Sequence, residues 1–249
     1  MIDLEGKTAL VTGGGRGIGR ATVRLLARAG ADVLLTYRTR APEAVAVAGE
    51  VTELGRRADV FGGDLADSAV VDRLAEAATR FGGLDIFVGN AGIWPPEDVP
   101  LRDVPAARWR EMLAANLDTI FLTTRAALRL MRAGGRVVLV GSTAGQRGEP
   151  YHADYAATKG AMIALVKSLA VECAPEITVN CVAPGWVDTE MCAPAFAAGG
   201  EARIAATIPL GRVATPEDVA GPILFLCSDL ARHITGEILN VNGGSVLCG

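Results

Sequence analysis

The chain has 249 residues, of which 50% are apolar, and a net charge of −4 at pH 7. This length and composition suffice for one large core, which excludes disordered and fibrous proteins, and the mild acidity argues against a nucleic-acid partner. No apolar run approaches the roughly 18 residues of a membrane span and no basic, then apolar leader opens the chain, so we expect neither a membrane partner nor a signal peptide.

The cysteines and histidines indicate the compartment and the metal content. The five cysteines are odd in number and show no CxxC spacing, and His152 and His233 are the only histidines. A zinc site is therefore not expected. Free thiols fit a reducing environment, so we expect a cytoplasmic protein that holds no metal.

The N-terminal part alternates between strand and helix patterns. Residues 7–13 (KTALVTG) form a short apolar run that predicts a buried strand, and a glycine-rich turn follows over 13–19. Residues 20–30 show helical spacing and end at a glycine, and 31–38 predict a second strand. Strand, turn, helix and strand make one βαβ unit with parallel strands.

The same alternation continues to the end of the chain. In order, the pattern predicts helix 41–55, a strand within 57–65, helix 66–82, strand 84–92, a helix over 102–131 with a break near Asn116, strand 136–142, a helix that carries Tyr155, strand 177–185, a helix from Thr215 and a last strand 237–244. This alternation predicts the α/β class: one domain over 1–249, built as a Rossmann-like, doubly wound parallel sheet of about seven strands with helices on both faces.

One segment lacks a clear pattern. Residues 186–212 contain Gly199-Gly200 and no strong periodicity, and we expect this segment to cover the substrate. Residues 190–210 form either a mobile lid or an ordered helical pair that does not move.

The glycine-rich turn GGGRGIG predicts a phosphate-binding site. Glycine permits a tight turn and a close approach of the backbone to a pyrophosphate, and the helix that follows presents free N–H groups and a positive dipole end. The main rival is a Walker loop, which needs a Gly-Lys-Ser/Thr sequence that does not follow here. We therefore expect a bound dinucleotide.

The end of the second strand indicates which dinucleotide. An NAD-binding chain places Asp or Glu about 20 residues past the glycines, where it holds the ribose hydroxyls. Here Tyr37 and Arg38 stand at that place, Arg40 follows, and Arg16 lies in the glycine turn. Because a guanidinium donates two hydrogen bonds to a phosphate, we predict NADP(H) over NAD(H). The alternative is that these arginines are ordinary solvated charges.

Several motifs follow predicted strands. The glycine turn, Asp64, Asn90, Ser142 and Pro184-Gly185 each come directly after one. Ligands in parallel α/β sheets lie beyond the carboxyl ends of the strands. These motifs are therefore expected to converge on one cleft.

Tyr155 and Lys159 stand four residues apart in an Ala-rich stretch that predicts a helix. One helical turn places the phenol and the ammonium on the same face, where the ammonium would lower the pKa of the phenol from its usual value of about 10. Such a phenol can give or take a proton at an oxygen, and Ser142 can hydrogen-bond the same oxygen. Taken alone, the pair also fits ordinary surface neighbours.

Ordered motifs run along nearly the whole chain: Thr12-Gly13 with Gly17 and Gly19, Asp64-Leu65, Asn90-Ala91-Gly92, Asn116, Ser142, Tyr155 with Lys159, and Pro184-Gly185 with Thr189. Together they resemble the short-chain dehydrogenase/reductase family. The resemblance implies an enzyme that interconverts a carbonyl and a secondary alcohol with a nicotinamide coenzyme. It also implies a homotetramer with the Tyr155–Lys159 helix in one interface.

The resemblance assigns a role to each motif residue. Tyr155 is the general acid or base, and Lys159 lowers its pKa and holds the nicotinamide ribose. Ser142 orients the substrate oxygen, and Asn116 supports a water that links Lys159 to solvent. The expected coenzyme contacts include Arg16, Tyr37 and Arg38, named above for the phosphate. The full set is Gly13, Arg16, Gly17, Ile18, Gly19, Tyr37, Arg38, Asp64, Leu65, Asn90, Ala91, Gly92, Tyr155, Lys159, Pro184, Gly185, Val187 and Thr189.

The substrate stays open between two readings. Within the family, the sequence is similar to the subgroup of 3-oxoacyl-carrier-protein reductases, which bind an acidic carrier protein through surface arginines. Pro175 and Glu176 stand where one such arginine is usual, and only Arg132 lies near the place of the other. Because a glutamate repels an acidic carrier, we favour a small free ketone or alcohol. A non-catalytic dinucleotide-binding protein is the remaining alternative, and the retained Ser142, Tyr155 and Lys159 argue against it.

The substrate pocket is expected beside Tyr155. Its expected lining is Ser142 with Trp94, Gln146, His152 and Trp186. Each tryptophan is alternatively a loop anchor, and His152 is a surface or substrate hydrogen-bonding residue rather than a catalyst.

Overall fold

The computed structural model describes residues 2–248, and within this range the strands form one parallel seven-stranded sheet in the order β3-β2-β1-β4-β5-β6-β7. The strands are β1 (Thr8–Val11), β2 (Asp32–Tyr37), β3 (Ala58–Gly62), β4 (Leu84–Gly89), β5 (Met131–Val140), β6 (Ile177–Pro184) and β7 (Ile238–Val241). The prediction of a doubly wound α/β fold is confirmed.

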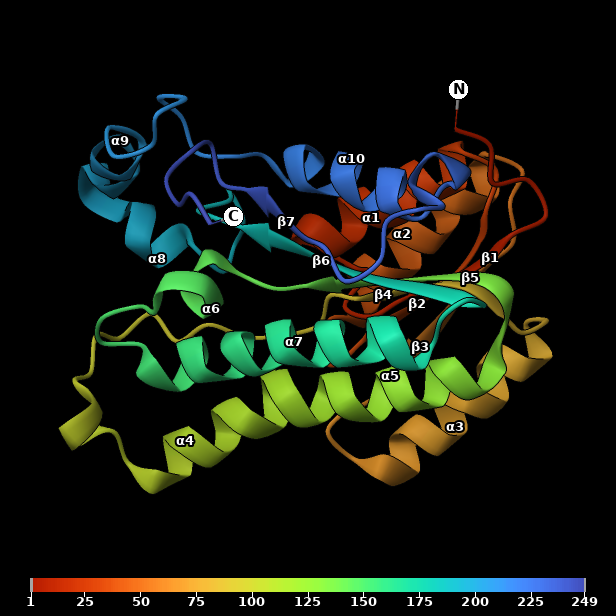
Figure 1. Ribbon diagram of the computed structural model, residues 1–249, viewed down its shortest axis with the longest axis horizontal. Coiled ribbons are helices and arrows are strands. Elements are labelled where there is room, and N and C mark those ends of the chain that lie inside the picture. Colours follow the sequence, from red (N-terminus) through yellow and green to blue (C-terminus); the bar gives the residue numbers. More distant parts are fainter. Residues whose placement is uncertain (1, 249) are drawn as a thin grey trace.

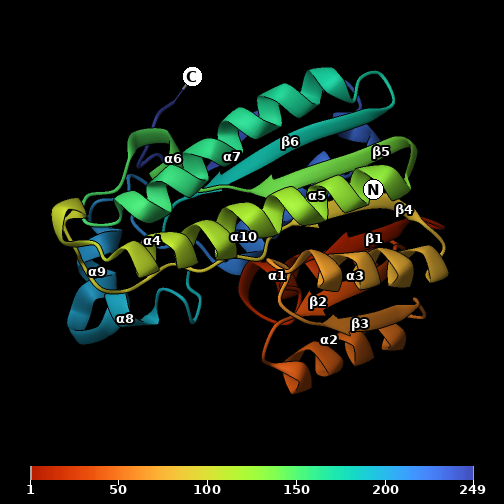
Figure 2. The same ribbon diagram turned by 90° about the horizontal axis from the view of Figure 1, so that it is seen from below.

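Helices cover both faces of this sheet (Figure 1). On one face lie α1 (Gly17–Arg28), α2 (Ala41–Glu53) and α10 (Pro216–Leu226). On the other lie α3 (Ser68–Arg80), α5 (Thr119–Leu130) and α7 (Ala153–Glu172), and Figure 2 shows this second layer from its outer side. Each face of the sheet is therefore buried, which explains why the strands read as nearly continuous apolar runs.

Alternate residues of each strand enter two separate cores. On β1, Ala9 and Val11 pack in the core under α1, whereas Leu10 packs in the core under α3 and α5. On β2, Val33 belongs to the first core and Leu34 to the second. The two-residue period of a strand thus divides one apolar run between two helical layers.

The strand order creates the crevice that a ligand needs. The chain runs outward from β1 to β3 and then returns to place β4 beside β1, with Ala9 paired with Ile86. The connections that follow β1 and β4 therefore leave toward opposite faces of the sheet. A crevice opens between them at the carboxyl ends of the strands.

The predicted helix over 102–131 differs in detail from the structure. A 3-10 turn (Leu101–Asp103) precedes α4 (Ala106–Leu113), and a π-helical turn (Ala114–Asp118) joins α4 to α5 without a gap. The expected break near Asn116 is thus a widened turn. The strand after it begins at Met131 rather than at residue 136, because Met131 already has extended dihedral angles and pairs with Leu84.

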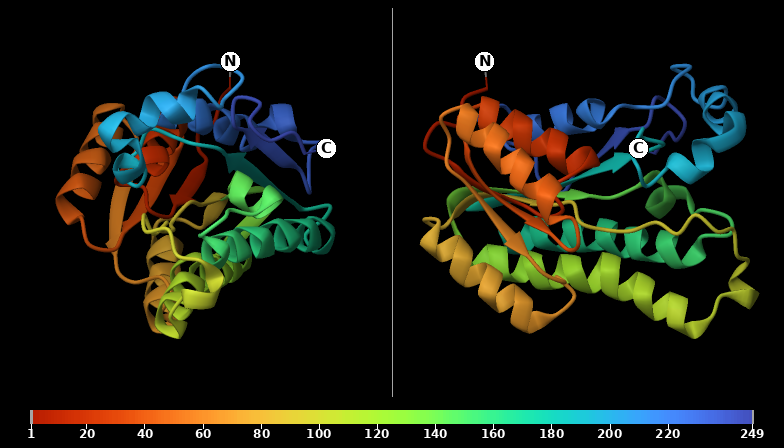
Figure 3. Two further views of the ribbon diagram at one scale, coloured as in Figure 1. Left: turned by 90° about the vertical axis from the view of Figure 1, so that its left-hand side faces the viewer. Right: turned by 180° about the vertical axis from the view of Figure 1, so that it is seen from behind.

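The segment over 186–212 contains short helices. They are α8 (Ala193–Phe196), a 3-10 turn (Ala197–Gly199) and α9 (Gly200–Ala205). Together with the start of α4 they lie at one end of the molecule (Figure 3). No helix within residues 2–248 is long and apolar enough to cross a membrane.

Candidate active site

One cleft lies at the carboxyl edge of the sheet and is lined by the loops that follow β1 to β6. It brings together most of the residues that the sequence singled out: Gly13, Arg16, Gly17, Ile18, Tyr37, Arg38, Asp64, Leu65, Asn90, Ala91, Gly92, Trp94, Asn116, Ser142, Tyr155, Lys159, Pro184, Gly185, Trp186, Val187 and Thr189. Three others, Gly19, Gln146 and His152, do not line it.

The glycine turn is held in shape by its neighbours. The N–H of Gly13 donates to Thr36 Oγ1 at 3.1 Å, and Asn90 Nδ2 donates to the carbonyl oxygens of Thr12 and Gly13 at 2.9 and 3.2 Å. A Cβ at Gly19 would overlap the carbonyl oxygen of Gly13 and would lie 2.6 Å from Asn90 Nδ2. Gly19 therefore permits the close packing of α1 against the turn and makes no contact with the cleft.

Two threonines support this turn. The Thr12 hydroxyl accepts the N–H groups of Asn90 and Ala91 at 2.9 and 3.0 Å, which joins the β1 loop to the β4 loop. The Thr36 contact comes from near the carboxyl end of β2. Sequence reasoning gave Thr36 no role, because no local pattern marks a contact that joins chain positions on different strands.

The cleft fits a dinucleotide. The residue before α1, Arg16, provides no side-chain cap to the first turn of the helix, so the N–H groups there stay free for an anion. Gly13 and Gly17 have φ of +66° and +51°, which lets the loop wrap around a phosphate. The Arg16 and Arg38 side chains line the same opening.

A carboxylate competes for two of the arginines at the cleft mouth. Glu190 Oε2 lies 3.0 Å from Arg16 Nη1 and 3.2 Å from Arg40 Nη2. Glu190 follows Thr189, whose Cγ2 would lie 3.2 Å from a Cβ placed on Gly17. The segment after β6 is therefore packed on the glycine turn and bridged to both arginine-bearing loops.

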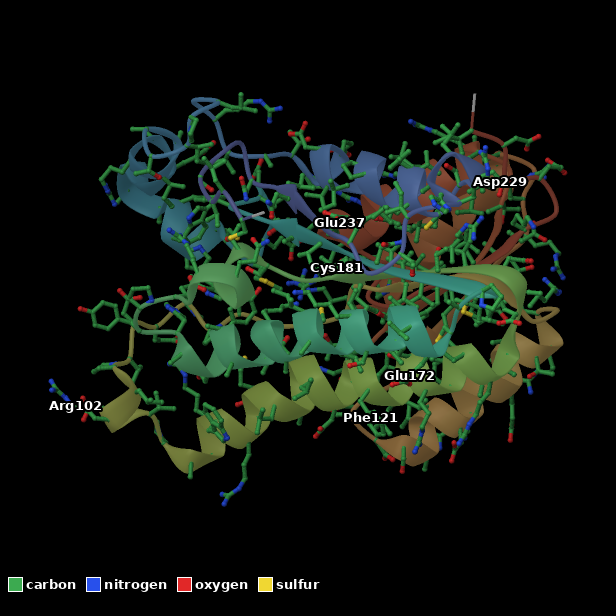
Figure 4. The ribbon with its side chains drawn as sticks, viewed as in Figure 1. Arg102, Phe121, Glu172, Cys181, Asp229 and Glu237 are labelled. Atoms are coloured by element: carbon green, nitrogen blue, oxygen red, sulfur yellow. The ribbon has the colours of Figure 1, made fainter. Side chains whose placement is uncertain are left out.

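The Tyr155, Lys159 and Ser142 side chains meet where β5 ends and α7 begins. Lys159 is 5% exposed, and its Nζ donates to the carbonyl oxygen of Val140 at 2.8 Å and lies 5.7 Å from the centre of the Tyr155 ring. Burial lowers the pKa of Lys159 to about 8, and the thiol of Cys181, between the sheet and α7 (Figure 4), acts in the opposite direction.

The expectation of a lowered Tyr155 pKa is not met in this structure. Desolvation raises the pKa of Tyr155, hydrogen bonding with the Ser142 side chain opposes this rise, and the nearby Glu149 carboxylate adds to it. The Lys159 ammonium does not offset desolvation, because it is itself buried and is bonded to Val140 rather than to the phenol. Four-residue spacing thus brings the two groups together without a direct bond.

Asn116 lies on the π-helical turn and is fully buried. Its Oδ1 accepts the N–H of Ile93 at 2.8 Å, and its Nδ2 donates to the carbonyl oxygen of Ile93 at 3.0 Å. The side chain therefore clamps the β4 loop where that loop borders the cleft. The widened turn is what directs the amide toward this loop.

Aromatic side chains form part of the cleft wall. The rings of Trp94 and Trp186 meet edge to face with centres 5.8 Å apart, and Phe196 of α8 packs on Trp186 at 6.0 Å. Trp94 and Trp186 line the cleft that Ser142 and Tyr155 also line, and Phe196 supports Trp186 from outside it.

Gln146 and His152 lie outside the cleft and serve its frame. Gln146 Nε2 donates to Asn240 Oδ1 at 2.6 Å. His152 is buried, stacks on Trp94 with ring centres 4.8 Å apart, and has Nε2 2.9 Å from the carbonyl oxygen of Pro95. Both side chains are used within the protein, so we leave them out of the proposed substrate contacts.

Sequence reasoning also gave no role to Glu149. This half-buried carboxylate lines the cleft, burial raises its pKa, and the neighbouring His152 and Trp94 side chains oppose the rise. Its only sequence signal is its position between Ser142 and Tyr155. No cluster of three or more His, Cys, Asp or Glu side chains that could hold a metal occurs within residues 2–248.

Comparison with known proteins identifies the family. A family model described as enoyl-(acyl carrier protein) reductase matches residues 13–245. The 3-oxoacyl-[acyl-carrier-protein] reductase FabG of Aquifex aeolicus is 41% identical over 98% of each chain. A short chain dehydrogenase of Burkholderia cenocepacia, solved in complex with NADP, is 38% identical with a TM-score of 0.91, over 97% of this chain and 98% of the other. This chain belongs to the short-chain dehydrogenase/reductase family.

A second relative has a different substrate. The cyclohexanol dehydrogenase of a Rhodococcus species is 39% identical, over 98% of this chain and 97% of its own. Because it belongs to this family, the present short-chain dehydrogenase/reductase is an oxidoreductase that uses a nicotinamide dinucleotide. Its relatives act on substrates as different as a carrier-bound oxoacyl group and a cyclic alcohol.

Proposed function

We propose that this enzyme is an NADP(H)-dependent oxidoreductase that interconverts a small ketone and a secondary alcohol. The observation that carries the proposal is the shared cleft: the Tyr155 phenol, the Ser142 hydroxyl and the Lys159 ammonium line the same cavity as the glycine turn. A non-catalytic dinucleotide-binding protein would have no use for this trio.

The proposed mechanism assigns one task to each side chain. Ser142 donates a hydrogen bond to the substrate oxygen, and Tyr155 gives that oxygen a proton during reduction or removes one during oxidation. Lys159, whose pKa of about 8 lies close to neutral pH, exchanges protons readily and holds the nicotinamide ribose. The bound coenzyme supplies or accepts the hydride.

The remaining coenzyme contacts are proposed along the cleft. The turn residues Gly13, Gly17 and Ile18 hold the pyrophosphate, Asp64 and Leu65 border the adenine, and Asn90 with its neighbours borders the ribose. Pro184, Gly185, Val187 and Thr189 hold the carboxamide of the nicotinamide. All of these residues line the cleft, and Gly19 supports it from behind. Asn116 acts by clamping the loop at Ile93.

NADP(H) is proposed over NAD(H) because of the charges at the adenine end. Tyr37 and Arg38 line the cleft at the end of β2, where NAD-binding proteins carry a carboxylate, and Arg16 faces them from the glycine turn. The NADP complex of the Burkholderia relative agrees with this choice.

The small-substrate proposal rests on the surface charges. Pro175 and Glu176 occupy a place where carrier-binding relatives use arginine, and a glutamate repels an acidic carrier. Arg132 is already engaged, since its Nη1 lies 2.6 Å from Asp85 and its Nη2 donates to the carbonyl oxygen of Gly82. The second candidate function is 3-oxoacyl-[acyl-carrier-protein] reductase, which the 41% identity to the Aquifex enzyme favours.

We further propose one catalytic domain over 1–249 that assembles as a homotetramer through α7. The five cysteines are free thiols, which supports a reducing compartment such as the cytoplasm.

Nicotinamide absorbance during turnover tests the proposal. Purified enzyme is given NADPH or NADH with a panel of an acetoacetyl thioester, free β-keto esters, diketones and cyclic or sugar-derived ketones. We expect faster turnover with NADPH and with small free carbonyls. Turnover confined to the thioester would favour the carrier-bound substrate, and faster turnover with NADH would contradict the role of Arg16 and Arg38.

A further inference from the structure

Glu149 lines the same cleft as the Tyr155 phenol and stands on the turn that leads into α7, the helix that carries Tyr155. We propose that Glu149 accepts a hydrogen bond from a hydroxyl next to the reacting carbon, so that the preferred substrates are hydroxy ketones and the vicinal diols made from them. This inference rests on the proposed carbonyl–alcohol chemistry and specifies its substrate class.

The turn that carries Glu149 is firmly anchored. It lies between α6 (Thr143–Arg147) and α7, and the carbonyl oxygen of Glu149 accepts the N–H of His152 at 3.1 Å. The His152 ring stacks on Trp94, and the carbonyl oxygen of Tyr151 accepts the N–H of Val99 at 3.2 Å. Two independent contacts thus fix this turn against the β4 loop, so the backbone that carries Glu149 is held in place before a substrate arrives.

The carboxylate has hydrogen-bonding capacity to spare. It lines the cleft, is half-buried, and accepts no side-chain hydrogen bond among the described residues, so its roughly four acceptor positions stay available. No ion pair to Glu149 occurs among the described residues 2–248. A hydroxyl on a ligand in the cleft can donate to one of these positions.

The charge of Glu149 also acts on Tyr155. The carboxylate raises the pKa of Tyr155, which keeps the phenol in the neutral form that donates a proton in reduction and disfavours the phenolate that oxidation needs. A glutamine at this position would lack this effect and would accept a weaker hydrogen bond from a substrate hydroxyl.

The chemistry of a carboxylate defines what it selects. It accepts strongly from a hydroxyl and repels a carboxylate or phosphate group placed beside it. A plain ketone leaves it without that donor, and a site built to bind a hydroxyl discriminates against the analogue that lacks one. In the reduction, hydride from NADPH bonds to the carbonyl carbon and the Tyr155 proton to its oxygen, while the second hydroxyl stays unchanged and NADP⁺ is released.

A matched pair of ketones tests the inference. We would measure kcat/KM with NADPH for 2-hydroxycyclohexanone and for cyclohexanone, which differ by one hydroxyl, in the wild type, Glu149→Gln and Glu97→Gln. We expect the wild type to prefer the hydroxy ketone by about ten-fold or more, as for a charge-assisted hydrogen bond. Glu149→Gln should reduce this ratio several-fold. Glu97, an exposed residue outside the cleft, should leave the ratio unchanged on substitution.

Several results would overturn the inference. A wild-type ratio near one does so without any variant, and so does a ratio that Glu149→Gln leaves unchanged. Equal losses for both ketones in Glu149→Gln and Trp94→Phe would show that Glu149 only anchors Trp94. If neither ketone nor any other carbonyl is turned over with either coenzyme, the proposed function fails instead.

Discussion

At the scale of single residues, burial decides the electrostatics of the proposed site. Lys159 and Tyr155 are both desolvated, which lowers the pKa of the lysine and raises the pKa of the tyrosine, so each group favours its neutral form. A neutral phenol is the form that donates a proton, so the structure is arranged for reduction. An amine whose pKa is about 8 can return the proton near neutral pH.

The lowered pKa of Lys159 predicts a pH-dependent stability. Below about pH 8 the lysine is charged in both the folded and unfolded states, and the folded state bears the full penalty of burying the ammonium. Between about pH 8 and the ordinary value near 10.5, only the unfolded state keeps the proton, so stability rises with pH. Relative to Lys159→Met, the free energy of unfolding of the wild type should gain up to about 2 kcal/mol between pH 8.0 and 9.5.

Urea denaturation of both proteins at the two pH values measures this gain. Both proteins share the other titrating groups, so the comparison cancels their effect on stability. Lys159→Met lacks the contact to Val140 at both pH values, so that loss cancels as well. A difference that stays constant with pH would contradict a buried, weakly basic Lys159.

The sequence predicted the identity of the site residues better than their electrostatics. Tyr155, Lys159 and Ser142 carry a local spacing that marks them. The desolvation of the phenol, the bond from Lys159 to Val140 and the charge of Glu149 depend on distances between elements, which no local pattern contains. His152 likewise stands near Tyr155 in sequence, yet its ring is used against Trp94 and Pro95.

At the scale of elements, the site depends on a close approach of α6 and α7. A Cβ at Gly145 would lie 2.5 Å from the carbonyl carbon of Lys159 and 2.6 Å from its oxygen. Gly145→Ala should therefore push α6 away from α7, displace Ser142 and Lys159, and destabilise the fold by about 1–3 kcal/mol. Thermal unfolding and kcat measure the two effects.

Gly160→Ala is the matched control. A Cβ there would meet only the carbonyl oxygen of Gly145, at an ordinary 3.6 Å, on the facing surface of the same helix pair. This substitution should leave stability unchanged or slightly raised, because alanine favours helices. Equal effects of the two substitutions would contradict the proposed importance of this approach.

The segment after β6 makes its own prediction. Glu190 pairs with Arg16 and Arg40, so a coenzyme phosphate must compete with its carboxylate. Glu190→Gln should lower the Kd for NADPH by about three-fold, the size expected when exposed ion pairs are removed, and should change the Kd for NADH less. Fluorescence titration at low and high salt checks this, and equal changes for both coenzymes would contradict it.

At the scale of the whole molecule, the parallel sheet explains why separate motifs form one site. Once the strands are parallel and the order reverses between β1 and β4, every strand-end motif must lie at one edge, and the cleft confirms this prediction. The early start of β5 was not predicted, and the short helices over 193–205 correspond to one of the two alternatives that the sequence left open for 190–210. Their weak periodicity and the glycines at 134 and 135 provide no local signal.

Assembly can be tested on the outer side of α5. Phe121 is 49% exposed there, on the side that faces away from α7 (Figure 4), and the Arg125 guanidinium lies 5.1 Å from its ring. Helix α5 lies beside α7 in the same layer (Figure 2), and we expect the proposed α7 interface to extend over α5, so Phe121→Glu should yield smaller species in size-exclusion chromatography with light scattering. Val45 of α2, on the other face of the sheet and 56% exposed, is the control, and Val45→Glu should leave the mass unchanged. A tetramer that tolerates Phe121→Glu would contradict an interface that spans both helices.

The central claim is that the Tyr155 phenol carries the proton of the reaction. The most direct measurement is kcat/KM with NADPH and a turned-over ketone for the wild type, Tyr155→Phe and Tyr151→Phe. Tyr151 lies four residues before Tyr155, is exposed and does not line the cleft. We predict that Tyr155→Phe lowers kcat/KM by about 10²–10⁴-fold while Tyr151→Phe has little effect. Wild-type turnover by a folded Tyr155→Phe would contradict the account.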